Sequence, residues 1–477
     1  MIFNNPLIRR YRYSLMRPRQ LWVHLIIHIS IIVLLLYVNY IAYEYQEIYK
    51  STTKLFISIC YQFLILQVVI LWIWGAINSG SAITKEITGN SYDFLRMLPL
   101  SAGKKAVGIL VGKNLIIMLL AVIDFILIII FGKLGQESNS WLAQSLFFLL
   151  SVALLINSVA LLSSIKFTIK KKKSNIATLI IIFFFLGPFI IRLVISAMNF
   201  RMFKSIKGSF FNIKLPVMIL SSLVAIYFSC WSIIGILRKF NKEDEPLFSR
   251  TGAYLFMIGY EFVLFGILYT RLTQGARIIN YSFWLISLLP ILAIPLWSIR
   301  SYNNYIEHIG LIHRKSVSSK NVLFRTFLYS NLFLGFGLFV IWAACAIGTT
   351  SMAQLDLQSY LYMIFVLLSS YLFLILLLEL YVVYYPVSSK VGIFVAVIAA
   401  VYFILPLILS DILEIDMLLQ ISPIGLIIEM FPNPDEEITI LNRTWIINLL
   451  LCIIPGLLIH KQYSQIFNTR KKMKTNT

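Results

Sequence analysis

Charged residues are scarce in this chain of 477 residues, because Asp, Glu, Lys and Arg together make up only 13% of it. A soluble domain carries about 25% charged residues. Hydrophobic residues make up 59%, and they fall in runs of roughly 20, the length that a helix needs to cross the hydrocarbon core of a membrane. No stretch has the composition of a soluble domain. The sequence therefore predicts an all-α polytopic membrane protein.

Cysteine is scarce as well. The four cysteines lie separately in apolar runs, without the paired spacing that a disulfide framework or a zinc site shows. We therefore expect no metal site and interpret the cysteines as small core residues; they are Cys60, Cys230, Cys345 and Cys452.

Acidic residues are outnumbered: 20 Asp and Glu stand against 41 Lys and Arg, and the net charge is +21. The basic residues gather in loops between apolar runs, and loops that stay in the cytoplasm collect Lys and Arg. Membrane lipids are therefore expected partners, and nucleic acid is not.

The apolar runs predict about twelve membrane spans. Basic and neutral loops mostly alternate, which predicts that both termini lie in the cytoplasm. The first run, at about 22 residues, is too long for the apolar part of a cleavable signal. The predicted spans are 21–43, 55–77, 108–132, 141–163, 177–197, 215–237, 252–272, 280–299, 326–348, 359–382, 391–410 and 444–460.

The order of span lengths and loop charges repeats from about residue 252, which predicts two six-span repeats. The first residues mix apolar side chains with arginines, a pattern typical of a helix in the headgroup plane; a disordered basic tail is the alternative. The expected parts are a basic interfacial segment 1–20, a first half 21–250, a second half 251–461 and a basic cytoplasmic tail 462–477.

The loop between the second and third predicted spans contains a short amphipathic pattern. Tyr92, Leu95 and the pair Met97–Leu98 fall near positions i, i+3 and i+6, the spacing of a helix face. Gly89 before them is typical of a helix end, and Pro99 after them stops a helix. The pattern predicts a short helix between Gly89 and Pro99.

This segment resembles the permease subunits of prokaryotic type-2 ABC exporters. An acidic residue, a glycine turn, a short helix with leucines and a Pro-Leu-Ser element match that family at Glu86, Gly89-Asn90, Leu95 to Leu98 and Pro99-Leu100-Ser101. The resemblance implies that the short helix is a coupling helix that docks into a groove on an ATPase subunit. The residues expected to carry this coupling are Glu86, Gly89, Tyr92, Leu95, Leu98 and Pro99.

The resemblance also implies short cytoplasmic coupling helices, a place in the bacterial cytoplasmic membrane, and a function. The chain would be a permease that moves a hydrophobic or amphipathic substrate out of the cytoplasm or the inner leaflet, driven by a separate ABC ATPase in two copies, which binds ATP and magnesium. The chain itself is expected to be no enzyme and to hold no cofactor. Its only likeness to a phosphate loop, Gly108 to Asn114, has three residues between the glycines where four are needed, and Asn where Ser or Thr is needed.

Two further loops have less definite patterns. The loop from Arg300 to Arg325 has Glu307, His308 and Arg314 but no Pro-Leu-Ser, and it is either a degenerate second coupling helix or an ordinary basic loop. Ser422-Pro423-Ile424-Gly425 resembles the element with which the same family's last outer loop dips back into the membrane; a surface loop is the alternative.

Several polar residues interrupt the predicted spans, where a charge costs roughly 2.5–3.5 kcal/mol. They are either interhelical hydrogen-bonding partners or part of a translocation path or proton relay. The candidates for the path are Asp124, Arg192, Glu261 and Glu379, and the other polar residues are His24, His28 and Asn157.

The loop between the fifth and sixth spans is basic, although the span count places it outside. The equivalent loop of the second half is acidic, so the two could pair as an outer gate made of Arg201, Lys204, Lys207, Glu436 and Glu437. Exposed pairs are weak, at about 0–1 kcal/mol, as a gate that opens in each cycle requires. Anionic lipid headgroups, or charges tolerated without a role, are the alternatives.

Two other functions remain open from the sequence. A proton-coupled secondary transporter would use Asp124, Glu261 or Glu379. A membrane-embedded polysaccharide polymerase or ligase would need a large outer loop with catalytic Arg or His, whereas the outer loops here are short and contain no histidine.

Overall fold

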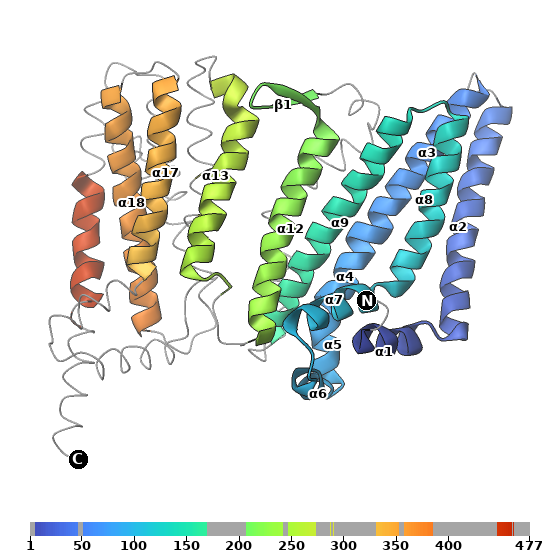
Figure 1. Cartoon of the computed structure of the whole chain (residues 1–477), viewed down its shortest axis with the longest axis horizontal. Helices are drawn as coiled ribbons and strands as arrows, with labels where there is room; N and C mark the ends of the chain where they lie inside the picture. The colour runs from blue at the N-terminus through green and yellow to red at the C-terminus, as the bar shows by residue number, and fades with distance from the viewer. Residues whose placement is uncertain are drawn as a thin grey trace, which may run out of the picture. The chain divides into compact units, whose positions relative to one another are not determined.

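The computed structural model describes residues 5–45, 51–168, 207–241, 247–272, 287, 290, 331–352, 357–384, 446–459 and 461. The chain forms two compact units, Met1–Leu247 and Phe248–Thr477, and each is described by itself. Apart from one β-hairpin, the elements in the described part are helices (Figure 1).

The first unit contains a short N-terminal helix, a set of long apolar helices and a group of short helices between two of them. In chain order its elements are α1 (Pro6–Leu15), α2 (Pro18–Glu44), α3 (Thr52–Val68), η2 (Val69–Trp74), α4 (Gly75–Gly80), α5 (Ala82–Thr88), α6 (Tyr92–Met97), α7 (Ala102–Lys113), α8 (Leu115–Leu134), α9 (Asn139–Thr168), β1 (Lys207–Phe210), β2 (Ile213–Pro216) and α12 (Val217–Asn241).

The described elements of the second unit are α13 (Arg250–Leu272), α17 (Asn331–Met352), α18 (Leu357–Tyr384) and an apolar helix at 446–459. Within this unit α13 packs against α17, and α17 packs against α18. Trp342 and Leu338 on α17 and Val366 on α18 are fully buried.

Six helices of the described part are long and apolar enough to cross a membrane, which confirms the predicted class of all-α membrane protein. The predicted count of twelve spans and the repeat stay predictions, because the spans at 177–197 and 391–410, and nearly all of 280–299, lie outside the described residues. The six are Pro18–Glu44, Thr52–Thr88, Leu115–Leu134, Asn139–Ile165, Val217–Asn241 and Arg250–Thr270.

The second of these helices is much longer than a membrane requires. It covers 37 residues from Thr52 to Thr88, a length of about 55 Å at 1.5 Å per residue, against about 30 Å of hydrocarbon. A π-helical stretch, η2, interrupts it. The excess length carries α5 to one end of the first unit, where Figure 1 shows α1, α5, α6 and α7 together.

The third predicted span, 108–132, is not one continuous helix. α7 ends at Lys113 and α8 begins at Leu115. Between them Asn114 leaves helical geometry, and its side-chain amide donates to the Leu110 carbonyl and to Ser79 Oγ, both at 2.9 Å. The membrane-crossing part is therefore Leu115–Leu134, and α7 is a separate helix before it.

Two clusters of buried side chains hold the first unit together. The larger joins α3 and η2 with α8 and α9, around Phe63, Leu64 and Leu149. The smaller lies where the short helices meet α9 and α12, and it consists of Leu7, Tyr11, Ala82, Ile83, Leu95, Ala106, Ile109, Leu161, Ile165 and Ile236. By contrast α2 exposes apolar side chains over most of its surface, as a helix in contact with lipid does.

The basic loop before α12 contains a hairpin that the sequence did not predict. β1 pairs with β2 antiparallel, with Ser209 opposite Lys214. The two turn residues, Phe211 and Asn212, have positive φ angles of 47° and 65°, as the commonest two-residue hairpin turn requires. Lys207 lies in β1, but Arg201, Lys204, Glu436 and Glu437 lie outside the described residues, so the outer gate stays a prediction.

Candidate functional site

The turn between α5 and α6 ends one helix and begins the next within three residues. The Ser91 amide donates to the Glu86 carbonyl and the Asn90 amide to the Ile87 carbonyl, which is the Schellman arrangement of a helix C-terminus. Asn90 holds the left-handed conformation in this motif, with φ 52°. Gly89 ends α5 as predicted, but the residue that reverses the chain is Asn90.

The short helix predicted between Gly89 and Pro99 is α6, which spans Tyr92–Met97. After it, Pro99 is exposed, and Ser101 caps α7 by accepting a hydrogen bond from the Lys104 amide at 3.4 Å. The Pro-Leu-Ser element therefore stops one helix and starts the next.

The two faces of α6 differ sharply in exposure. Leu95 is fully buried in the smaller cluster of the first unit, and Tyr92 and Leu98 pack against that cluster. Phe94 and Met97 are 58% and 78% exposed. Tyr92, Leu95 and Leu98, which were expected to dock on the partner, thus attach α6 to its own chain. The exposed apolar surface belongs to Phe94 and Met97.

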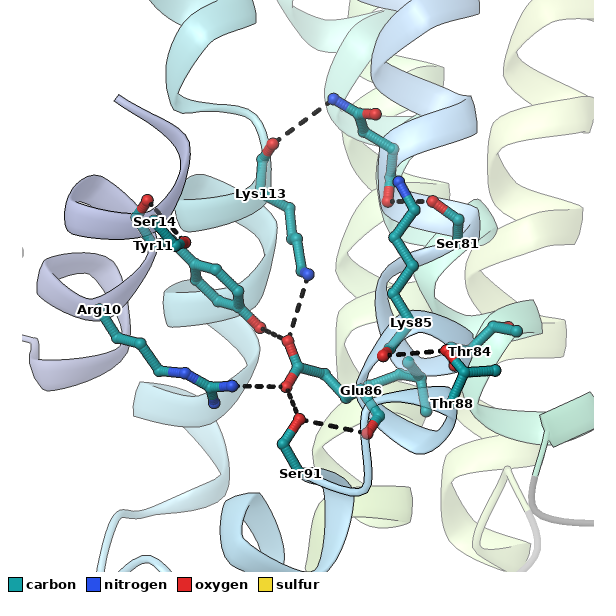
Figure 2. A network of polar contacts seen from close by, with 12 residues as sticks. Arg10, Tyr11, Ser14, Ser81, Thr84, Lys85, Glu86, Thr88, Ser91 and Lys113 are labelled. Atoms are coloured by element: carbon teal, nitrogen blue, oxygen red, sulfur yellow. Dashed lines mark hydrogen bonds and ion pairs between the residues drawn. The ribbon is translucent and has the colours of Figure 1, made fainter. Parts of the chain in front are cut away.

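The carboxylate of Glu86, at the end of α5, receives four polar partners. Arg10 Nη2 lies 2.9 Å from Oε2 and Lys113 Nζ lies 3.2 Å from Oε1. The Tyr11 hydroxyl donates to Oε1 at 2.8 Å, and Ser91 Oγ donates to Oε2 at 2.5 Å. Figure 2 shows all four side chains pointing at this one carboxylate, which joins α1, α5, α7 and the start of α6.

The electrostatics of this group favour a charged carboxylate. Glu86 is only 4% exposed, and a buried carboxylate stays charged only where cations and donors compensate the lost water. Burial, followed by the charge of Glu86, raises the pKa of Tyr11 far above its usual value, so the phenol remains a donor. Burial lowers the pKa of Lys113, and the Glu86 carboxylate opposes that shift.

The ring of Tyr11 lies between the two cations of the network. Lys113 Nζ is 4.6 Å and the Arg10 guanidinium 5.8 Å from its centroid, within the range of cation–π attraction. Tyr11 therefore holds both cations beside the carboxylate as well as donating to it.

Two glycines of α7 let α1 approach closely. A Cβ atom at Gly108 would lie 2.8 Å from Leu7 Cβ, and a Cβ atom at Gly112 would overlap the Tyr11 ring. Glycines four residues apart on one helix face allow such close packing between helices. The segment that looks like a phosphate loop in the sequence is thus the part of a helix on which α1 packs.

The N-terminus of α1 is fastened to the same helix. Asn5 caps α1 by accepting from the Leu7 amide at 3.0 Å, and its own amide donates to the Lys104 carbonyl at 2.6 Å. The predicted basic amphipathic segment is therefore a helix, and its apolar side, with Leu7, Ile8 and Tyr11, is buried.

Asp124, which the sequence placed on a possible translocation path, pairs with a histidine of another helix. His28 Nε2 on α2 lies 2.9 Å from Asp124 Oδ1 on α8, and both side chains are buried. His24, one turn earlier, contacts the Trp74 ring at 5.5 Å between centroids. The interhelical alternative fits Asp124 and His28.

Asn157 belongs to a chain of hydrogen bonds that links three helices. Ser79 Oγ donates to Asn157 Oδ1 at 3.0 Å, and the Asn114 amide donates to Ser79 Oγ at 2.9 Å. Asn157 also donates to the Leu71 carbonyl, within the π-helical stretch, at 3.2 Å. This network holds α4 and α9 at the break between α7 and α8.

Glu261 lies on α13 in the second unit and is 1% exposed. Neither of its carboxyl oxygens has a hydrogen-bond partner in the described part of the chain. The side chain of Glu379, the whole of Arg192, and the second-loop residues Glu307, His308 and Arg314 lie outside the described residues, as does Ser422 to Gly425.

Sequence reasoning found Glu86 but missed its partners Arg10, Tyr11, Ser91 and Lys113. The arginines before the first span and the Gly108–Gly112 pair were visible, but nothing in their spacing indicates that they meet at one carboxylate.

Among the described residues no group of His, Cys, Asp and Glu could hold a metal ion. Comparison with family models, with curated proteins and with solved structures found no match to this chain.

Proposed function

We propose that this chain is the membrane permease subunit of an ABC exporter, which moves a hydrophobic or amphipathic substrate out of the cytoplasm or inner leaflet with a separate ATPase. The observation that carries the proposal is α6. It is a short helix beside the end of a long membrane helix, fixed to its own chain on one face and apolar and exposed on the other.

The way α6 is fixed supports a docking role. A helix of six residues does not persist alone in water, so the buried Leu95 and the bond between Ser91 and Glu86 must hold it in place. A rigid element that presents large apolar side chains is what a partner's pocket recognises, since a few buried anchors carry most of the binding energy. Phe94 and Met97 are those anchors in our proposal.

The position of α6 favours a protein partner over lipid. The helix from Thr52 to Thr88 exceeds the hydrocarbon thickness by about 25 Å, and α6 follows its end. Asp93 on α6 and Lys85 on α5 are also exposed, and charges next to the apolar pair suit a protein groove better than a bilayer interior. Apolar surface in that position is a mark of an interaction site.

The Glu86 group would transmit a movement of α6 into the membrane part. Ser91 links the start of α6 to Glu86, and Glu86 is bound in turn to α1 through Arg10 and to α7 through Lys113. α7 leads directly into the membrane helix α8. A shift of α6 caused by the ATPase would therefore move α1 and α7 with it, while ATP and magnesium stay on the partner.

The proposal is tested by purifying the chain with its partner. Tagged chain extracted gently from its native membrane is expected to carry a soluble subunit with a Walker loop and to hydrolyse ATP. Phe94→Asp with Met97→Asp is expected to lower the recovered ATPase at least about tenfold, since anchor residues carry 2 kcal/mol or more each.

Phe94→Leu with Met97→Leu is the matched control, because it keeps the apolar surface and should keep the complex. Equal recovery of the ATPase with the two aspartates and with the two leucines would exclude the docking role of α6. Leu95→Asp is unsuitable for this test, since it places a charge in the chain's own core.

A further inference from the structure

Glu261 occupies a position where an acidic residue is not expected. It is eleven residues from each end of α13, Arg250–Leu272, and so about 16 Å from either end along the helix axis. It shares a helix face with Met257 and Ala253, four and eight residues earlier, and both are fully buried. The side chain therefore lies on the packed face of a membrane helix, near its middle.

No cation compensates this carboxyl group within the described part of the unit. The basic residues of α13, Arg250 and Arg271, are ten or eleven residues away, at about 15 Å or more along the helix. α17, the helix that packs against α13, has no charged residue, and the titratable group that it brings near Glu261 is the Cys345 thiol. Within the described residues neither carboxyl oxygen has a hydrogen-bond partner.

A carboxylate in such a place would be very unstable. Moving an isolated ionised carboxylate into an apolar interior costs far more than the free energy of folding can supply, and such a group takes up a proton instead. Asp124 shows the alternative solution within the same chain, since it is buried in the middle of α8 but has His28 as its partner. Glu261 has no such partner among the residues that the structure describes, so the neutral acid is the form that fits.

We infer that Glu261 is a proton-binding site of the second unit, which holds a proton in this conformation. It exchanges that proton only in a conformation that brings water to the packed face of α13. The reaction is the simple equilibrium between the carboxylic acid and the carboxylate plus a proton. The inference does not depend on the proposed ATPase partner, because it rests on α13 and α17 alone.

Infrared difference spectra of the full chain test the inference directly. At about pH 7, well above the usual pKa of a glutamic acid, the spectrum of wild type minus Glu261→Gln is expected to contain the carbonyl band of a protonated carboxylic acid. Glu44→Gln is the matched reference, because Glu44 is exposed on α2 and its difference spectrum should contain carboxylate bands. Carboxylate bands from Glu261 would overturn the inference.

Stability as a function of pH gives a second test. The folded chain keeps a proton that the unfolded chain has lost, so folding binds a proton and stability falls as the pH rises. The melting temperature of Glu261→Gln is therefore expected to rise above that of wild type, by a margin that grows as the pH rises above about 4.3, the usual pKa of a glutamic acid. A wild type that becomes the more stable form at high pH would contradict a neutral Glu261.

Glu261→Met serves as a second variant, since it is neutral and similar in size. If both neutral variants fail to fold, the charge of Glu261 is needed and the inference is wrong. If either folds, the spectra decide.

Discussion

Glu86 in the first unit and Glu261 in the second are both almost fully buried, yet their surroundings are opposite. Glu86 has two cations and two hydroxyl donors, which come from α1, from α7 and from the turn before α6. Glu261 has no hydrogen-bonding or ionic partner in the described part of its unit. A carboxylate whose partners are all in place holds its helices in fixed positions, because moving any one partner leaves a buried charge unpaired. A carboxyl group without partners can change its protonation state without breaking a contact.

The largest expected effect on the free energy of unfolding distinguishes Glu86 from Glu261. Glu86→Ala leaves Arg10 and Lys113 without their common partner and is expected to lower the free energy of unfolding by about 3 kcal/mol, the lower end for a broken buried pair because Arg10 is partly exposed. Glu261→Gln is expected to leave it unchanged or to raise it. Denaturant unfolding in detergent micelles measures both. Equal losses in the two variants would refute the distinction.

The next effect concerns the contact between α1 and α7. Gly112→Ala places a methyl group inside the Tyr11 ring, and overpacking of this kind costs about 1–3 kcal/mol. Gly103→Ala in the same helix is the control, since its Cβ atom would meet only Leu237 Cδ2 at 3.9 Å. Thermal unfolding should separate the two variants, and protease cleavage near Arg12 should increase only for Gly112→Ala. Similar behaviour of the two would mean that α1 is not held on α7.

A smaller effect is expected from removing one donor. Tyr11→Phe keeps the ring between the cations but loses the hydrogen bond to Glu86, which should cost about 1.5 kcal/mol for a bond to a charged group. In a double-mutant cycle with Glu86→Gln the two losses should fall short of additive, because both remove the same bond. Strict additivity of the two unfolding free energies would show that Tyr11 and Glu86 do not act together.

The smallest effect on stability is expected at the surface of α6. Phe94→Ala with Met97→Ala should change the unfolding free energy by no more than about 0.5 kcal/mol, as exposed substitutions do. Tyr92→Ala should cost more, because Tyr92 packs against the buried cluster. A large loss of stability from the Phe94 and Met97 pair would mean that these side chains support the chain itself.

The sequence predicted local features of the first unit well. The apolar runs, the amphipathic helix before the first span and the short helix between Gly89 and Pro99 follow from periodicity and from helix-ending residues, which act over a few positions. The break at Asn114 was missed because the predicted third span ran through it, and the side chain there donates to Ser79, 35 residues earlier in the chain, a contact that no local pattern reports.

The site was predicted only in part, because its contacts also join residues that are far apart in the chain. Glu86 and the position of α6 were found, but Arg10 lies 76 residues from Glu86 in the chain, and no local pattern reports that contact. The faces of α6 were assigned from apolar spacing, which cannot tell a side chain that packs on its own chain from one that awaits a partner. Leu95 is the first kind, and Phe94 and Met97 are exposed.

Site-directed crosslinking from α6 tests the central claim most directly. A photoreactive p-benzoylphenylalanine is placed at Met97 or, as the matched control, at Tyr13, which is 72% exposed on α1, and the chain is illuminated in its native membrane. Met97 is expected to crosslink in high yield to a separate polypeptide that contains a Walker loop, and Tyr13 is not. Crosslinks from Met97 to lipid alone, or to no other chain, would contradict the account of α6 as the docking helix for an ATPase.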